Sequence, residues 1–99
     1  MEPFSFPSDL IAGRRAGAAC IVSAGDLPIR ISWLKDGGNI SSFLNPMIDT
    51  KDFTSFLTFE KVSKEHSGQY TCLAENPAAS SNYTAPLLVQ GKSRRPWIY

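Results

Sequence analysis

The sequence lacks features that define several large classes of protein. Its 99 residues contain no apolar run that approaches the roughly 20 residues of a membrane-spanning helix. The first residues, Met1-Glu2-Pro3, have neither the basic start nor the apolar centre of a secretory signal peptide. We therefore expect one small domain taken from a longer parent, to which any signal and membrane anchor would belong.

The chain has almost no excess of one charge sign, and it has few side chains that could bind a metal. With a net charge of +1, the chain has no field that would favour nucleic acid or anionic lipid as its main partner. One histidine, His66, and two cysteines, Cys20 and Cys72, cannot assemble a four-ligand metal site from nitrogen and sulfur donors. We expect no metal and no cofactor. We also expect no enzyme, because the chain is too short for a core plus an enclosed catalytic cavity.

The two cysteines are better interpreted as a disulfide pair. A bond between Cys20 and Cys72 would close a loop of about 50 residues, which in the chain-entropy model stabilises a fold by roughly 4 kcal/mol. Disulfides persist in oxidising compartments, so the pair predicts such a compartment, of which the extracellular side of the cell membrane is one.

The stretch around the second cysteine organises the chain. Tyr70 stands two residues before Cys72 and follows a Ser67-Gly68 turn, which is typical of a tyrosine that fixes the turn leading into a cysteine strand. Together with Cys20 and Trp33, this stretch predicts one β-sandwich whose two sheets are joined by the disulfide.

Alternating apolar residues predict the strands of that sandwich. The alternation runs through residues 16–23, 29–35, 54–59 and 83–89. About seven short strands separated by turns, without a long helix, predict an all-β sandwich. The expected core residues are Trp33, Leu57, Phe59 and Tyr70.

Weaker patterns complete the domain. Residues 4–10 contain a proline and are expected to form an edge strand with a bend. Residues 47–51 predict a weak strand, and residues 61–67 predict a single helical turn. The domain is expected to span residues 3–90, with residues 91–99 a linker, the start of a following domain or an added tail.

Four motifs together carry a family resemblance: Cys20, Trp33, Leu57-Thr58-Phe59 and Gly68-x-Tyr70-x-Cys72. As a set they resemble the immunoglobulin superfamily, most closely its I-set branch, over residues 3–90. The resemblance implies an immunoglobulin-like two-sheet Greek-key sandwich with one inter-sheet disulfide.

Five longer segments carry a closer resemblance. They are Pro3-Phe4-Ser5-Phe6-Pro7, Gly25-Asp26-Leu27-Pro28, Trp33-Leu34-Lys35-Asp36-Gly37, Glu65-His66-Ser67-Gly68 and Asn82-Tyr83-Thr84-Ala85-Pro86-Leu87. They are similar to the Down syndrome cell adhesion molecule (Dscam) family of arthropods, with the N-terminal variable domain of the shortened chelicerate forms nearest. The resemblance implies a neuronal or immune cell-surface receptor whose alternative first domains bind identical copies of themselves on an opposing cell. It also implies a membrane-anchored parent with neighbouring immunoglobulin domains.

One residue departs from the superfamily pattern. His66 stands where the superfamily usually has an aspartate paired with a basic residue, and Lys51 is the expected basic partner. An imidazolium beside a lysine would be a like-charge pair, so we expect stability to fall on acidification. His66 next to Ser67 does not predict a hydrolase, because that chemistry needs a nucleophile, a base and an orienting acid to converge.

Two N-glycosylation sequons begin at Asn39 and Asn82. Both lie in or beside the sheet expected to hold Trp33, and Asn82 is expected to face solvent because its parity opposes that of Tyr83. A glycan on this sheet would obstruct a protein partner and leave the sheet that contains Cys20 open.

The outward residues of that open sheet form the predicted contact between two copies. An exposed isoleucine and phenylalanine among threonines suit a flat, self-complementary surface. The family resemblance implies antiparallel association of two copies through this sheet, whose strands the superfamily letters A, B, E and D. The opposite sheet also has outward apolar residues, Leu34 and Leu73, so scattered surface apolar residues are the alternative. The predicted homophilic interface is Ile21, Thr50, Thr54, Phe56 and Thr58.

Two other functions remain open. One is a structural spacer in a multi-domain array, as in intracellular muscle proteins of the same fold, with both cysteines reduced. The other is recognition of a different partner, such as a pathogen surface. Lys92, Arg94 and Arg95 are better explained as part of a linker than as a nucleic-acid site, because three charges without a folded basic face give little specificity.

Overall fold

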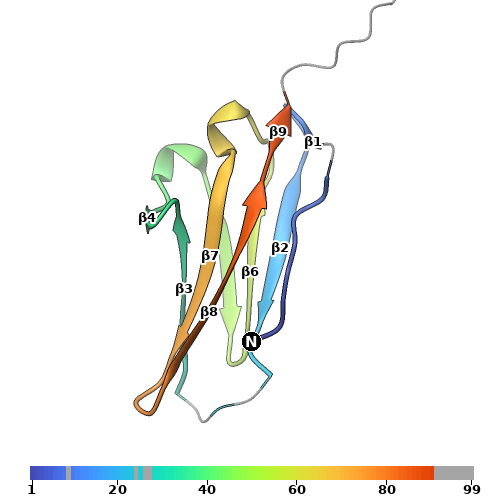
Figure 1. The fold of residues 1–99 in the computed structure, drawn as a ribbon. Coiled ribbons are helices and arrows are strands. Elements are labelled where there is room, and N and C mark those ends of the chain that lie inside the picture. Colours follow the sequence, from blue (N-terminus) through green and yellow to red (C-terminus); the bar gives the residue numbers. More distant parts are fainter. Residues whose placement is uncertain (9, 24, 26–27, 91–99) are drawn as a thin grey trace, which may run out of the picture.

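The structure is a computed structural model that describes residues 1–8, 10–23, 25 and 28–90. Two β-sheets pack face to face (Figure 1), so the all-β sandwich expected from the sequence is confirmed. The three-stranded sheet contains, in spatial order, β2 (Ala16–Ile21), β6 (Thr54–Phe59) and β5 (Met47–Lys51). The four-stranded sheet contains β4 (Gly38–Asn39), β3 (Arg30–Lys35), β7 (Gly68–Glu75) and β8 (Ser80–Leu87).

Short elements complete the sandwich. A parallel pair, β1 (Leu10–Ile11) and β9 (Val89–Gln90), lies at one end of it (Figure 1). The loops between strands contain two 3-10 turns, η1 (Ser42–Leu44) and η2 (Lys64–His66). The second is the helical turn predicted for residues 61–67. In the described part of the chain, no helix is long and apolar enough to cross a membrane.

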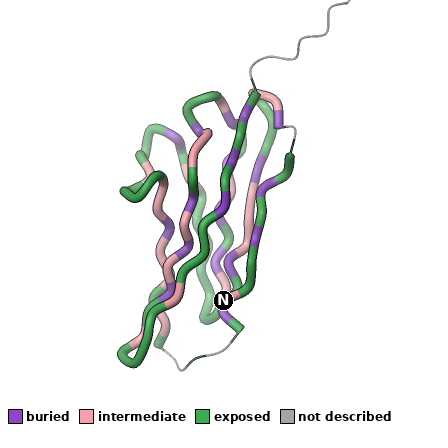
Figure 2. Tube along the Cα trace, viewed as in Figure 1, coloured by how far each residue is buried: buried purple, intermediate pink, exposed green. Residues whose placement is uncertain are grey.

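The core lies between the sheets, and buried residues alternate with more exposed ones along β6 and β7 (Figure 2). Leu57, Phe59 and Tyr70 are fully buried, and Trp33 is 6% exposed. The disulfide between Cys20 and Cys72 joins the two sheets, with their Cα atoms 6.3 Å apart. Each large apolar side chain removed from water stabilises the fold by roughly 1.5 to 3 kcal/mol, so these residues supply much of its stability.

A polar contact beside the disulfide was not predicted from the sequence. Ser55 of β6 is fully buried, and its Oγ accepts a hydrogen bond of 2.9 Å from Trp33 Nε1 of β3. The same hydroxyl shares a 2.7 Å hydrogen bond with Thr50 Oγ1. A buried hydroxyl or indole N–H without a partner would destabilise the fold. This contact therefore satisfies both groups and links the two sheets.

The first segment differs from the edge strand expected over residues 4–10. Among the described residues of this segment, only Leu10–Ile11 forms a strand, which pairs with β9, while Glu2 N donates to Ile21 O at 3.0 Å. Pro3 and Pro7 have no N–H to contribute to a ladder, which explains the shorter strand. The predicted extent was wrong, although Phe4 and Phe6 of this segment are buried.

One further prediction, the linker or tail at residues 91–99, lies outside the described residues.

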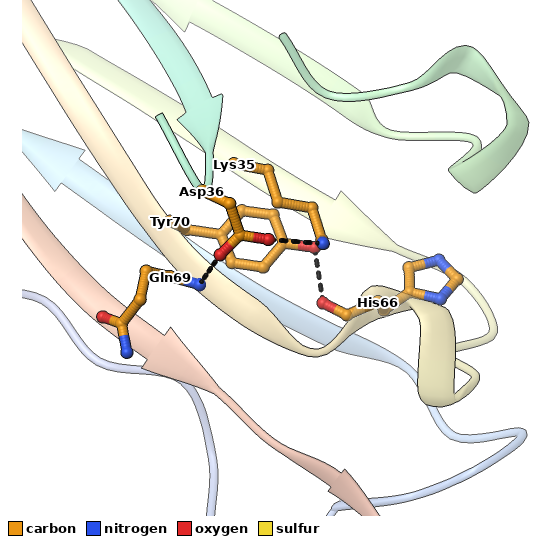
Figure 3. Close-up of polar contacts among 5 residues, drawn as sticks. All are labelled: Lys35, Asp36, His66, Gln69 and Tyr70. Atoms are coloured by element: carbon orange, nitrogen blue, oxygen red, sulfur yellow. Dashed lines mark hydrogen bonds and ion pairs between the residues drawn. The ribbon is translucent and has the colours of Figure 1, made fainter. Parts of the chain in front are cut away.

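Tyr70 holds the turn that leads into β7 (Figure 3). Its hydroxyl donates a 2.6 Å hydrogen bond to the backbone oxygen of His66. Burial raises the pKa of Tyr70 well above its ordinary value, and the Asp36 carboxylate acts in the same direction. The hydroxyl therefore keeps its proton and remains a donor to the turn.

A second contact holds the start of β7 (Figure 3). Asp36 has a left-handed backbone conformation with φ 51°. Its carboxylate accepts a 2.9 Å hydrogen bond from Gln69 N and lies 2.9 Å from Lys35 Nζ. The Gln69 N–H, followed by the Lys35 ammonium, holds the pKa of Asp36 below its ordinary value. A Cβ on Gly68 would lie 2.8 Å from Asp36 Oδ2, so glycine permits this close approach.

We predict that Tyr70→Phe lowers the free energy of unfolding at neutral pH by about 1 kcal/mol, because it removes a buried hydrogen bond. In the unfolded chain a tyrosine ionises near pH 10, whereas the raised pKa keeps Tyr70 neutral in the folded state. The unfolded state therefore gains stability by ionising as the pH rises above about 10. Thermal melting at increasing alkaline pH should show a smaller loss of stability in Tyr70→Phe than in the wild type.

Tyr83→Phe is the matched control, because Tyr83 is 37% exposed. Its alkaline loss of stability should match that of the wild type. An equal alkaline loss in Tyr70→Phe and the wild type would contradict the role assigned to the Tyr70 hydroxyl.

Candidate recognition face

The outer surface of the three-stranded sheet is the candidate recognition face, here named the β2–β6–β5 face. Residues directly opposite each other in an antiparallel pair project to the same side of a sheet, so the strand register identifies its members. The face consists of Gly17, Ala19 and Ile21 of β2, Thr54, Phe56 and Thr58 of β6, and Met47, Asp49 and Lys51 of β5.

Phe56 lies at the centre of this face. It pairs with Ala19 on one side and with Asp49 on the other. Half of Phe56 is exposed, as are about half of Met47 and 41% of Ile21. Because the neighbouring residues of β2 are small, the phenyl ring is left open to solvent, and the face is apolar at its centre with charged residues along its β5 edge.

The structure places four of the five predicted interface residues on this face. Ile21 and Phe56 are exposed, and Thr54 and Thr58 are half-buried beside them. The outward direction expected for Thr50 was wrong, since Thr50 pairs with the inward residue Ser55 and hydrogen-bonds to its hydroxyl, although Thr50 itself is exposed at the edge of the sheet. A change of one residue in register moves every side chain of a strand to the other side, and the weak pattern of β5 left its parity undetermined.

The sequence reasoning missed the three β5 members of the face, Met47, Asp49 and Lys51. A signal for them was available. A hairpin that joins Lys51 to Thr54 through Asp52 and Phe53 pairs Asp49 with Phe56, and so places both on one side. Asp49 and Lys51 bring opposite charges to the edge of an otherwise neutral surface.

Both sequon asparagines lie on the opposite side of the sandwich. Asn82 of β8 pairs with Leu73, and Asn39 of β4 pairs with Leu34. Leu34 and Leu73 alternate with the buried residues of their strands, so these pairs share the outer surface of the four-stranded sheet. Both asparagines are exposed, whereas the two leucines are half-buried. Glycans at these positions would cover this surface and leave the β2–β6–β5 face free.

His66 serves as a structural residue of η2. It is 5% exposed, its Nδ1 accepts a 2.9 Å hydrogen bond from Ser63 N, and its Nε2 donates to Leu44 O at 3.0 Å. Its ring also packs edge-on against Phe59, with 4.7 Å between ring centroids. Ser63 Oγ also lies 3.2 Å from Nδ1 and donates a 2.8 Å hydrogen bond to Glu65 Oε1, so both ring nitrogens have contacts within the fold.

The expected pairing of His66 with Lys51 was wrong. Lys51 pairs with Thr54 beside the β5–β6 turn, whereas His66 contacts Phe59 at the other end of β6 (Figure 1). The fold therefore does not form the His66–Lys51 pair from which a loss of stability on acidification was expected. Ser67, the residue after His66, also has a structural contact, since its Oγ accepts a 2.9 Å hydrogen bond from Val89 N.

The chain is similar in sequence and in fold to known proteins. A family description, "Immunoglobulin domain", matches residues 5–76. The cell adhesion molecule Dscam2 of Drosophila melanogaster is 42% identical over 99 residues, which cover 99% of this chain and 5% of that protein. The chain thus spans about a twentieth of the length of this curated relative.

Solved structures give two further similarities. A crystal structure of the Dscam1 Ig7 domain, isoform 5, is 37% identical with a TM-score of 0.84, covering 90% of this chain and 93% of that one. The I-band fragment I67–I69 from titin is 36% identical with a TM-score of 0.77, covering 92% of this chain and 34% of that one.

We predict that a domain secreted from eukaryotic cells carries a glycan at Asn82, and a second at Asn39, because both asparagines are exposed on one outer surface. Intact mass should fall by one glycan in each of Asn39→Gln and Asn82→Gln. A wild-type mass equal to that of the bare chain would contradict the prediction.

Proposed function

The chain belongs to the immunoglobulin domain family, and on that premise we propose that it is an extracellular recognition module of a cell-surface adhesion receptor. The module binds a second copy of itself, presented by an opposing cell, through the β2–β6–β5 face. Its similarity to a cell adhesion molecule, of which it spans a small part, supports this function. The rest of the parent would supply neighbouring immunoglobulin domains and a membrane anchor.

The observation that carries the proposal is the contrast between the two outer surfaces. The β2–β6–β5 face exposes Phe56 and Ile21, at 50% and 41%, and contains no sequon. The opposite surface holds Asn39 and Asn82. A flat surface with an apolar centre and a polar edge suits a protein partner. A twofold contact would bring the same residues of two copies together.

Adhesion through a single domain of this kind is strengthened by many copies acting together. A single pair can be weak, because tethering many copies between two membranes raises their effective concentration. Specificity then depends on small differences in shape and charge on the face.

A structural spacer in an array of immunoglobulin domains is the second candidate, favoured by the similarity to the titin I-band fragment. The disulfide between Cys20 and Cys72 supports the adhesion receptor instead, since an intracellular spacer would keep its cysteines reduced. Recognition of a different partner would use the same open face but would leave the isolated domain monomeric.

We predict that Phe56→Asp and Ile21→Asp each weaken self-association by roughly tenfold or more, because each buries a carboxylate at an apolar contact. Sedimentation over a range of concentrations measures this effect. Thermal melting should change little, because both side chains are substantially exposed in the single domain.

Leu88→Asp is the matched control, since Leu88 is 68% exposed and lies between β8 and β9, outside the β2–β6–β5 face. It should associate like the wild type. Undiminished association of both Phe56→Asp and Ile21→Asp would refute the proposed face, and a strictly monomeric wild type would favour the spacer or a different partner.

A further inference from the structure

Two opposite charges stand on the β2–β6–β5 face without a counter-charge of their own. Asp49 and Lys51 are both exposed and project outward from β5, two residues apart. Among the described residues, the ion pairs join Arg15 to Glu60 and Lys35 to Asp36. Neither Asp49 nor Lys51 takes part in them, so both charges are free to meet a partner.

The position of Asp49 and Lys51 along β5 favours some alignments of two copies over others in a twofold contact. Two copies that stack face to face about an axis perpendicular to their strands place β5 over the partner's β5, running in the opposite direction. An axis through Asp49 would set it against the partner's Asp49. An axis through Lys51 would set two ammonium groups together. An axis midway, at Thr50, sets each Asp49 against the partner's Lys51.

We propose that two copies of this domain associate antiparallel with the axis crossing β5 at Thr50, and that Asp49 and Lys51 determine this register. The inference rests on the proposed function and specifies the partner's alignment. Each contact contains two reciprocal Asp49–Lys51 pairs, one on each side of the axis. The charges thus favour this alignment over those with the axis at Asp49 or at Lys51, in which like charges meet.

The apolar residues of the face fit the same register. Phe56 pairs with Asp49 and Thr54 pairs with Lys51, so an axis midway between these rows lays Phe56 against the partner's Thr54. On β2, Ile21 in the Thr54 row is laid against the partner's Ala19 in the Phe56 row. A large side chain therefore meets a small one in each case, which lets the two surfaces approach closely.

Charge exchange tests the register. Asp49→Lys and Lys51→Asp should each weaken self-association by about tenfold, because each replaces two attractive contacts by two repulsive ones. The double variant carrying both changes should associate like the wild type, since its pairs are restored with the signs exchanged. An equimolar mixture of the two single variants should form a mixed dimer more tightly than either variant forms its own.

Arg15→Glu is the matched control, because it also reverses a charge beside β2 but lies beyond the predicted contact. It should leave association unchanged, as measured by sedimentation at low salt, where exposed charges are least screened. Mass spectrometry of the mixture, with one variant isotopically labelled, counts mixed and self dimers.

The outcomes separate this inference from the proposed function. If Phe56→Asp abolishes dimers while both charge reversals associate like the wild type, the face stands and the register is overturned. A double variant as weak as the single variants also overturns it. If neither Phe56→Asp nor the charge reversals affect association, or if the wild type is a monomer, the proposed function and the register fail together.

Discussion

The contact between the two sheets beside the disulfide is the constraint on which the rest of the structure depends. The bond between Cys20 and Cys72 joins the sheets, and the hydrogen bond from Trp33 to Ser55 satisfies the polar groups buried next to it. A domain of this size has a small core, so a covalent link and a satisfied polar contact at its centre both matter. The two sheets are therefore joined at the centre of the core by a covalent bond and a hydrogen bond.

Polar contacts at one end of the sandwich complete the scaffold. Tyr70 binds the turn of His66, Asp36 binds the start of β7, and His66 binds the loop at Leu44. These side chains bind backbone groups of the fold itself, so His66 has a structural role at this end of the sandwich. The outer surfaces of the two sheets differ, since one exposes Phe56 and Ile21 and the other holds both sequon asparagines.

Much of the fold could be predicted from the sequence because its signals are local or strongly spaced. The alternation of residues 54–59 predicted the inward Leu57 and the outward Phe56, and the tyrosine before Cys72 predicted the corner. The first strand was overestimated because Pro7, within the expected range, cannot donate to a ladder. The assignment of Thr50 was wrong because five exposed residues of β5 carry no clear apolar alternation.

The sequence by itself determined the family, the disulfide, the core residues of the strong strands and the outward parity of Phe56. Only the tertiary structure decided which residues flank Phe56, where Lys51 lies and that both sequons share one surface. These facts depend on strand register and on which strands become neighbours, and both are set by contacts between residues distant in the chain. Periodicity gives the side of a strand on which a residue lies, whereas neighbours across strands are defined only when the sheet forms.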